Sequence, residues 1–284
     1  MRMRILSART PVWAGVVAQA SQLIDGPGFQ PLKRSSKTVA GFLAMDGTTV
    51  FIKRVGEGAW LKGWLRRLGG SRARRVIRGA AILRAGGFAR PEPLAAAEAR
   101  ALGAVRASYV ISEPLDGARV MSQVVLAGGR RRFHHRCAVL ATVAREIRRL
   151  HDAGIYTLDL QETNLMITGG DGPEWKIYFV DLEDFRRARV VSMRRRMLNL
   201  VHLDRTIGRF LPRSQRLRFF YNYLGRRPAH DDARRLLTRY FALRARAQRR
   251  AHADRTTTAP ATSPTVRSET AGATSLTHVR AARD

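Results

Sequence analysis

A β-hairpin is predicted near the start of the chain from its pattern of apolar and polar positions. Residues 38–45 and 48–55 are rich in β-branched and aromatic side chains, and Asp46-Gly47 between them is a pair favoured in two-residue turns. Side chains alternate along a strand, so Lys53 shares its face with the apolar residues two positions before and after it. The pattern therefore places one lysine among apolar neighbours on a strand.

Helices are predicted where apolar residues recur every three or four positions. Residues 133–152 show such a stripe, with arginines off it. A strongly basic helix is expected over 71–85, and Gly86-Gly87 ends it. The other predicted elements are strands at 94–99 and 104–112, a hairpin with strands at 164–168 and 175–180, and helices at about 193–210, 213–225 and 230–246.

The order of these elements predicts an α+β protein with two lobes. Strands dominate before the sequence Glu-Pro-Leu-Asp-Gly at 113–117, which we interpret as a hinge, and helices dominate after it. The last residues are rich in Ser, Thr and Ala and carry few large apolar side chains, which is typical of disorder. We expect an N-terminal extension over 1–26, a small β-rich N-lobe over 27–113, a mainly helical C-lobe over 114–248 and a disordered tail over 249–284.

The charge of the chain indicates an anionic partner without identifying it. The 284 residues include 52 Lys plus Arg against 22 Asp plus Glu, a formal net charge of +30. Such a protein is attracted to nucleic acid, anionic lipid surfaces or phosphorylated glycans. No nucleic-acid motif and no basic-aromatic strand pattern is present, so specific nucleic-acid binding is not expected.

Several features favour a reducing compartment. A single cysteine, Cys137, allows no disulfide within the chain, and no apolar run approaches the length needed to span a bilayer. Arg2 and Arg4 precede a short apolar patch over 11–17, which resembles a signal peptide only weakly, so we favour an uncleaved N-terminus in the cytoplasm.

Three polar residues in the second half are spaced as phosphoryl transfer requires. Asp159 is followed five residues later by Asn164, and the predicted hairpin then leads to Asp181. In phosphoryl transfer one carboxylate orients the attacking hydroxyl, while an amide and a second carboxylate hold Mg²⁺ against the phosphates. The two strands of the hairpin would bring Asn164 and Asp181 together. Taken singly, Asp159 and Asn164 are also common in helix caps and turns.

These residues resemble the motifs of protein-kinase-like folds. Asp159 matches the catalytic-loop aspartate, Asn164 the asparagine five positions on, and Asp181-Leu182-Glu183 stands where Asp-Phe-Gly usually stands. Lys53 matches the strand lysine that contacts the α- and β-phosphates. The resemblance implies a two-lobed kinase-like fold that uses ATP and Mg²⁺, with Asp159 as the base and Asn164 and Asp181 as metal ligands.

More closely, the chain resembles the lipopolysaccharide kinase family, which phosphorylates Kdo or heptose of the inner core. The resemblance covers roughly residues 27–245. It is carried by Leu32-Lys33-Arg34-Ser35, the hairpin through Ile52-Lys53-Arg54, Leu150-His151 up to Asn164, Arg194–Arg196 with Asn199-Leu200, Leu217–Phe219 and Tyr223-Leu224. It implies an ATP-dependent phosphotransferase whose partner is an anionic glycolipid, working in the cytoplasm with peripheral contact to the inner face of the cytoplasmic membrane.

Three departures from the kinase pattern keep other interpretations open. No Gly-x-Gly-x-x-Gly covers the phosphates, and Lys33, Ser35 and Ser36 are the candidates for that work. The usual His-Arg-Asp is Thr157-Leu158-Asp159. The basic helix over 71–85 has no acidic residue to pair with Lys53, and whether nearby Glu57 replaces it is open.

Two alternatives to the lipopolysaccharide kinase follow. One is a kinase for another small molecule or for protein, and the other is a non-catalytic pseudokinase scaffold, which the missing helix Glu supports. Two further features are expected to be structural or open. His151 ends its helix and is expected to support the structure, whereas Trp60 and Trp64 either lie in a membrane interface or pack on the N-lobe.

Overall fold

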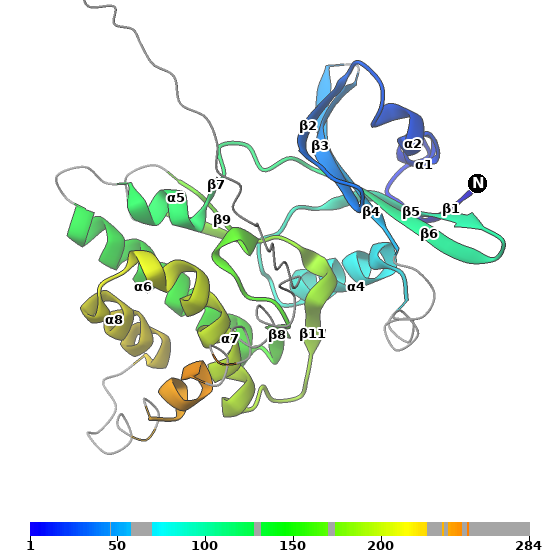
Figure 1. The fold of residues 1–284 in the computed structure, drawn as a ribbon. Helices are drawn as coiled ribbons and strands as arrows, with labels where there is room; N and C mark the ends of the chain where they lie inside the picture. Colours follow the sequence, from blue (N-terminus) through cyan, green and yellow to red (C-terminus); the bar gives the residue numbers. More distant parts are fainter. Residues whose placement is uncertain are drawn as a thin grey trace, which may run out of the picture. The chain divides into compact units, whose positions relative to one another are not determined.

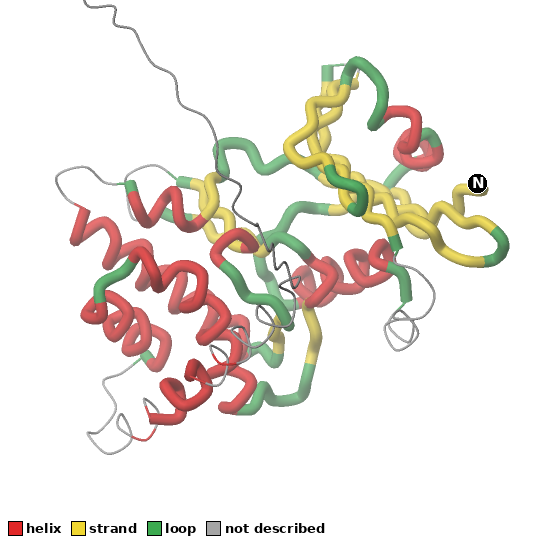
Figure 2. The backbone as a smooth tube through the Cα atoms, in the orientation of Figure 1, coloured by secondary structure: helices red, strands yellow, loops and turns green. Residues whose placement is uncertain are grey.

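The computed structural model describes residues 1–45, 47–57, 70–127, 132–169, 174–225, 235, 238–245 and 249. The chain divides into two compact units, Met1–Arg244 and Ala245–Asp284, and nearly all described residues belong to the first. Within that unit, strands make up most of the N-terminal half and helices most of the C-terminal half (Figure 2). The predicted α+β class is therefore confirmed.

One antiparallel sheet of six strands forms the N-terminal half, in the order β1-β5-β6-β4-β3-β2 (Figure 1). Its strands are β1 (Arg2–Ala8), β2 (Phe29–Arg34), β3 (Thr38–Met45), β4 (Thr48–Gly56), β5 (Pro93–Ala101) and β6 (Ala104–Ser112). The predicted hairpin is β3 and β4, paired from Thr38 with Val55 to Met45 with Thr48. The predicted pair at 94–99 and 104–112 is β5 and β6. Both predictions are confirmed.

The first residues of the chain are built into this sheet, which the sequence did not predict. β1 pairs antiparallel with β5 and forms one edge of the sheet. The apolar patch becomes helix α1 (Pro11–Ala18), with α2 (Ala20–Leu23) after it. Val16 and Val17 of α1 are buried in the same apolar cluster as Ile52 and Tyr109 of the sheet. The apolar positions of this segment therefore serve the N-lobe core.

Helix α4 (Arg72–Ala85) lies between the sheet and the C-terminal half. It begins at Ser71, whose side chain accepts a hydrogen bond from the backbone of Arg74, and the chain turns at Gly86. This matches the predicted basic helix. Figure 1 shows α4 beside the segment that leads into β11 (Phe185–Arg187), and contacts to that segment are among its closest.

The C-terminal half is built around helix α6 (Arg132–Asp152), as the apolar stripe predicted. Val139, Val143, Ile147 and Leu150 on that stripe are fully buried. Among the described residues this half also contains the helices α5 (Met121–Leu126), α7 (Met193–Ile207) and α8 (Arg213–Leu224). Single-turn 3₁₀ helices are η2 (Glu162–Asn164), η3 (Leu182–Asp184) and η4 (Gly208–Phe210). Short strands are β7 (Arg119–Val120), β8 (Ile155–Thr157), β9 (Leu165–Thr168) and β10 (Lys176–Phe179).

The predicted second hairpin is present and positions the candidate site. β9 and β10 pair antiparallel, from Leu165 with Phe179 to Thr168 with Lys176. The open end of this hairpin lies at Asn164 and Val180, where the backbone N–H of Val180 donates to the carbonyl of Asn164 at 3.0 Å. Two residues that the sequence places far apart are thus joined just before Asp181.

Some expectations lie outside the described residues. Trp60 and Trp64 belong to the segment 58–69, and most of the predicted tail is likewise outside. Within the part of the chain that the structure describes, no helix combines the length and the apolarity needed to cross a membrane.

Candidate functional site

Lys53 and Asp181 form an ion pair that joins the two halves of the chain. Lys53 Nζ on β4 lies 2.8 Å from Asp181 Oδ1, although the residues are 128 positions apart in the sequence. The two side chains are 32% and 29% exposed, so the pair is shielded but still open to solvent. The lysine that the hairpin pattern singled out therefore reaches the carboxylate that ends the second hairpin.

Asn164 and Asp159 are tied to each other by a backbone contact. Asn164 Nδ2 donates to the backbone oxygen of Asp159 at 3.0 Å, which leaves the amide oxygen of Asn164 without a protein donor within the described residues. The Asp159 carboxylate accepts from Gln161 Nε2 at 2.5 Å, and its backbone N–H donates to Thr157 Oγ1. These contacts fix a loop with the partly exposed Asp159 carboxylate at its tip.

Asp181 has an unusual backbone conformation. Its φ of 57° and ψ of 59° lie in the left-handed region, where Asp is tolerated better than most residues but still at a cost. The 3₁₀ turn η3 begins directly after it, with Leu182 and Glu183 buried. The turn redirects the chain so that the Asp181 side chain faces Lys53, while the next residues enter the core.

A cavity of about 590 Å³ surrounds the Lys53–Asp181 pair. Its walls come from β2 to β6, α4, the segment 113–118, β9 and the Asp181 turn. They include Lys33, Lys53, Asn164 and Asp181 together with apolar Ala40, Val110, Leu115 and Met166. Ser35, Ser36 and Asp159 are not among its lining residues. Ser35 instead closes the β2–β3 turn, because its Oγ accepts from the backbone N–H of Thr38 at 3.0 Å. The structure thus gathers four of the seven candidate residues in one cavity.

Glu57 does not take the place of a helix glutamate as partner of Lys53. Its carboxylate accepts from the backbone N–H of Arg72, at 2.8 Å, and from Ser108 Oγ, at 2.6 Å. It therefore caps the N-terminus of α4, where the helix dipole favours a negative charge. The described partner of Lys53 is Asp181.

His151 supports the structure around the Asp159 loop, as expected from its position at the end of its helix, and it does so through Tyr223 and Asn199. His151 is fully buried, with Nδ1 at 2.8 Å from Tyr223 Oη and Nε2 at 3.0 Å from Asn199 Oδ1. Asn199 Nδ2 donates to the carbonyl of Thr157 at 2.7 Å. Because Asn199 Oδ1 can only accept, His151 Nε2 carries the proton and Nδ1 accepts from the tyrosine. Burial lowers the pKa of His151 to about 4.

Two ionisable groups near the site have shifted pKa values. Burial lowers the pKa of His202 on α7, although the nearby charge of Asp159 and a backbone hydrogen bond at Leu158 act in the opposite direction. Burial, followed by the charges of Glu183 and Asp181, raises the pKa of Asp184. The Asp181 turn therefore gathers three carboxyl groups, and Asp184 is the one that resists ionisation. Neither His202 nor Asp184 belongs to a motif that sequence spacing alone would reveal.

The donor set suits a magnesium-bound nucleotide. The amide oxygen of Asn164 and the carboxylate of Asp181 are the hard oxygen ligands that Mg²⁺ prefers, and both residues line the same cavity. Lys53 lies beside them and can balance phosphate charge. No cluster of three or more His, Cys, Asp and Glu suited to a metal is found within the described ranges, so a magnesium ion held here would need phosphate oxygens as further ligands.

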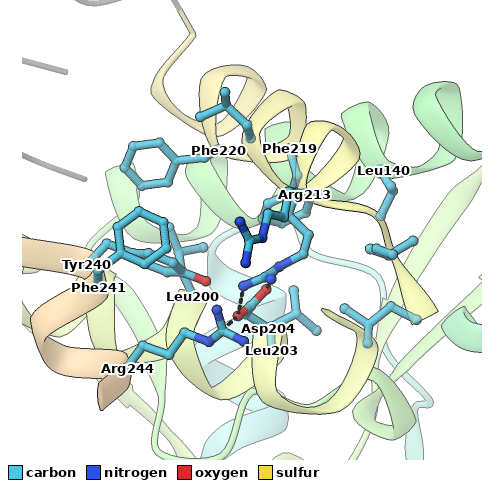
Figure 3. A pocket seen from close by; sticks show the side chains of 14 residues that line it. Leu140, Leu200, Leu203, Asp204, Arg213, Phe219, Phe220, Tyr240, Phe241 and Arg244 are labelled. Atoms are coloured by element: carbon cyan, nitrogen blue, oxygen red, sulfur yellow. Dashed lines mark hydrogen bonds and ion pairs between the residues drawn. The ribbon is translucent and has the colours of Figure 1, made fainter. Parts of the chain in front are cut away.

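A second cavity, also of about 590 Å³, lies in the helical half and is shown in Figure 3. Its wall is mostly apolar and aromatic, with Leu200 and Leu203 from α7, Phe219 and Phe220 from α8, and Tyr240. Asp204 lies on one side of it and is held by Arg216 at 2.6 Å and Arg244 at 3.2 Å. The cavity combines an apolar interior with arginines beside it (Figure 3).

The fold and the site together define the class of protein. The architecture is kinase-like. The β-rich half carries Lys53 and has helix α4 packed against it, and the helical half contains Asp159, Asn164 and Asp181. A solved structure described as "WaaP in complex with acyl carrier protein" has this fold, with a TM-score of 0.60, at 20% sequence identity over 89% of this chain and 98% of that one. No curated protein sequence matches this chain.

The sequence model of the lipopolysaccharide kinase (Kdo/WaaP) family matches residues 40–223. The chain belongs to this family. The resemblance drawn from its motifs is therefore confirmed, and so is the kinase-like fold. The matched range begins on β3 and ends on α8, so it contains Lys53, Asp159, Asn164 and Asp181.

Proposed function

We propose that this chain is an ATP-dependent kinase that phosphorylates a sugar hydroxyl, of Kdo or heptose, in the lipopolysaccharide inner core. The observation that carries the proposal is the convergence of Lys53, Asn164 and Asp181 in one cavity, with the Lys53–Asp181 ion pair at 2.8 Å. Family membership supports the substrate class. The positive net charge of +30 suits a phosphorylated, anionic acceptor.

Each candidate residue has a role in this proposal. Lys53 would contact the α- and β-phosphates, and Asn164 with Asp181 would hold Mg²⁺, which neutralises charge on the phosphates when bound. Lys33 lies on the cavity wall and adds positive charge beside the phosphates. Asp159 does not line the nucleotide cavity, and its carboxylate, which also accepts from Gln161, would orient the acceptor hydroxyl and take its proton. Ser35 and Ser36, on the turn between β2 and β3, stay candidates for covering the phosphates.

The test is phosphate transfer by the purified protein with Mg²⁺ and ATP. Dephosphorylated core lipopolysaccharides that end at Kdo or carry heptose serve as acceptors, and the product sugar is identified by mass. Asp159→Asn should lower turnover by about 10²- to 10⁴-fold with little change in nucleotide affinity, whereas Asp181→Asn should weaken Mg²⁺-nucleotide binding as well. Asp25→Asn, an exposed carboxylate outside the cavity, is the control.

The outcomes separate this proposal from its alternatives. Nucleotide binding without transfer to any core acceptor would indicate a pseudokinase, and transfer only to another small molecule or to protein would change the substrate class. Absence of nucleotide binding would contradict the assignment of the site. We further propose that the chain works in the cytoplasm, where ATP is available, with peripheral contact to the anionic inner face of the cytoplasmic membrane.

We also propose an acyl carrier protein as a partner, because the WaaP structure was solved with one. The apolar cavity of Figure 3 supports this, since it offers aromatic and aliphatic walls beside Arg216 and Arg244. If an acyl chain enters the cavity, an acylated carrier should bind this chain at least about tenfold more tightly than the same carrier without its acyl chain. Equal affinity for the two carriers would exclude the cavity as an acyl site.

A further inference from the structure

Helix α4 has the opposite charge from the one that a kinase normally places next to its strand lysine. It carries no acidic residue, and two of its arginines bind one carboxylate of the opposite half. Arg72 Nη1 lies 2.7 Å from Glu183 Oε1, and Arg75 Nη2 lies 2.8 Å from Glu183 Oε2. The two arginines are three positions apart, so they project from the same face of the helix.

Glu183 is buried and close to the candidate metal ligand. Only 6% of its side chain is exposed, and it follows Asp181 by two residues within the turn η3. Its backbone oxygen accepts from Arg186 Nη1 at 2.9 Å. A buried carboxylate that loses its partners is strongly destabilising, so this turn is stable in the observed position only while the arginines of α4 are in place.

The backbone of α4 also lies directly against this turn. A Cβ atom on Gly79 would overlap the carbonyl oxygen of Leu182, so the glycine permits a contact that any other residue would block. Gly79 is seven positions from Arg72 and therefore on the same side of the helix. Two salt bridges and a close backbone approach thus fix the turn after Asp181 to one face of α4.

The other contacts of α4 hold it to the N-terminal sheet. Its first turn is capped by Glu57 and by Ser108, whose Oγ accepts from the backbone N–H of Ala73 at 3.1 Å. Arg74 Nε donates to the buried carboxylate of Glu98 on β5 at 3.0 Å. Since the same sheet carries Lys53, α4 links the position of the lysine to the position of Asp181.

We propose that the ion pairs of Glu183 with Arg72 and Arg75 position Asp181 and take the place of the helix glutamate of ordinary kinases. The charges of helix and partner are exchanged relative to those kinases. In those kinases a helix carboxylate holds the strand lysine. In this chain the helix arginines hold a carboxylate beside the metal ligand, and so they set where Asp181 stands. The missing helix glutamate is therefore compatible with an active site. This inference rests on the proposed nucleotide- and Mg²⁺-binding role of Lys53 and Asp181.

Loss of these ion pairs is expected to weaken Mg²⁺ binding more than it weakens nucleotide binding. If the ion pairs of Glu183 with Arg72 and Arg75 act through Asp181, their loss should weaken Mg²⁺-dependent nucleotide binding. Residues that orient a metal ligand typically contribute 10- to 100-fold to metal affinity. Glu183 lies on the cavity wall beside Asp181, whereas the apolar part of the wall, with Ala40, Val110 and Met166, comes from β3, β6 and β9. Binding of nucleotide without metal should then be retained.

The experiment compares Arg75→Gln, Glu183→Gln and the double variant with the wild-type chain. Nucleotide affinity is measured by titration in EDTA and again across a Mg²⁺ series, and folding is checked by thermal unfolding. We expect nucleotide affinity in EDTA within about twofold of wild type, a rise of about tenfold in half-saturating Mg²⁺, and no further rise in the double variant. Arg75→Lys, which keeps the charge, should largely restore the Mg²⁺ response.

The matched control is Arg78→Gln, an exposed arginine on the same helix for which the described part of the chain shows no ion pair. If Arg75→Gln does not fold, Arg72→Gln replaces it, because Arg72 is the more exposed member and leaves Arg75 on Glu183. Since Arg72 also lines the cavity, the Mg²⁺ response of this variant is compared with its own affinity in EDTA. An unchanged Mg²⁺ response in folded variants, additive effects of the two changes, or an equal effect of Arg78→Gln would overturn the inference while the proposed function stands. A wild-type chain that binds no nucleotide would instead refute the proposed function and this inference with it.

Discussion

Asp181 shows at the scale of one residue how the site is held in place. Its left-handed backbone costs free energy that a free loop would not retain, and the observed conformation persists because its surroundings fix it. On one side its carboxylate contacts Lys53, and on the other the buried turn follows immediately. The contacts with Lys53 and with the buried turn therefore help to hold the Asp181 side chain toward the cavity.

His151 provides a prediction at the same scale. The fold accommodates this side chain in its neutral form, because it is fully buried and its pKa falls to about 4, from 6.5 for an exposed histidine. The unfolded chain binds a proton below pH 6.5, and the folded chain does not until about pH 4. The contribution of His151 to stability is therefore complete above pH 6.5 and decreases by about 1.4 kcal/mol per pH unit as the pH falls toward 4.

The measurement is the free energy of unfolding by urea at pH 7 and pH 5. The wild-type chain should lose about 2 kcal/mol more than His151→Gln over this range. His134→Gln, an exposed histidine on the same helix, should behave as wild type. If His151→Gln keeps the full acid sensitivity, another group is responsible.

Individual residues were predictable from the sequence only where a motif or a periodicity marked them. Lys53, Asn164 and Asp181 were marked by their spacing, and all three line the cavity. Glu183 and Asn199 stood within quoted motifs, but their roles were not predicted, because these depend on contacts with partners 108 and 42 positions away. Such long-range pairs have no local pattern, and their recognition requires the fold.

At the scale of elements, α4 is the part of the molecule where the sequence and the kinase pattern disagree most. The sequence predicted its bounds to within one residue, since its basic composition and the Gly86-Gly87 pair that ends it are local features. It did not predict what the arginines bind, and the missing glutamate suggested an inactive protein. In the structure the helix supplies the positive partners, Arg72 and Arg75, and the Asp181 turn supplies the negative one, Glu183.

In the N-terminal segment, by contrast, the sequence did not predict the elements that form. Its residues over 11–17 carry no alternation or stripe that identifies a partner, so their apolar character alone resembled a targeting signal. In the structure they form α1, and β1 before it completes one edge of the sheet. The β1 pairing with β5 spans more than 85 residues, which is why short-range patterns did not reveal it.

The contact between α4 and the Asp181 turn gives an element-scale prediction. Gly79→Ala raises helix propensity by about 1 kcal/mol, yet its methyl group would overlap the Leu182 carbonyl. Forcing apart well-packed backbone costs about 1–3 kcal/mol, so we expect a net loss of stability. Half-saturating Mg²⁺ should rise as well, because the turn carrying Asp181 moves with the helix.

Gly15→Ala is the matched control for this change. Gly15 lies in α1, is exposed, and has no atom within 4 Å of an added Cβ. Thermal unfolding should show Gly15→Ala at or above the stability of wild type and Gly79→Ala below it. Equal gains in the two variants would mean that the close approach at Leu182 is easily relieved.

At the scale of the whole molecule, several of the scarce acidic residues form ion pairs with arginines of the same chain. Within the part of the chain that the structure describes, five carboxylates each bind two arginines: Glu92 with Arg84 and Arg90, Glu98 with Arg74 and Arg100, Asp152 with Arg148 and Arg196, Glu183 with Arg72 and Arg75, and Asp204 with Arg216 and Arg244. Each of these clusters keeps a net positive charge, and the other 17 acidic residues face 42 Lys plus Arg, so the excess of +30 acts outward on the surroundings.

This excess predicts salt-dependent attraction to the surface where a glycolipid acceptor would lie. The purified chain should bind vesicles that contain anionic phospholipid at low salt and release them as salt is raised to about 0.5 M, because screening then acts within about 4 Å. Vesicles of neutral phospholipid alone should bind little at any salt. Co-sedimentation of protein with vesicles at a series of salt concentrations measures both.

The two vesicle types also separate electrostatic attraction from insertion of apolar side chains. Binding driven by arginines depends on lipid charge and disappears with salt, whereas insertion of Trp60, Trp64 or other apolar groups would persist on neutral vesicles and at high salt. If binding persists in both conditions, the net charge does not direct the chain to its surface, and an apolar segment does. If binding follows lipid charge and salt together, the arginine excess is sufficient to bring the kinase cavity to an anionic membrane.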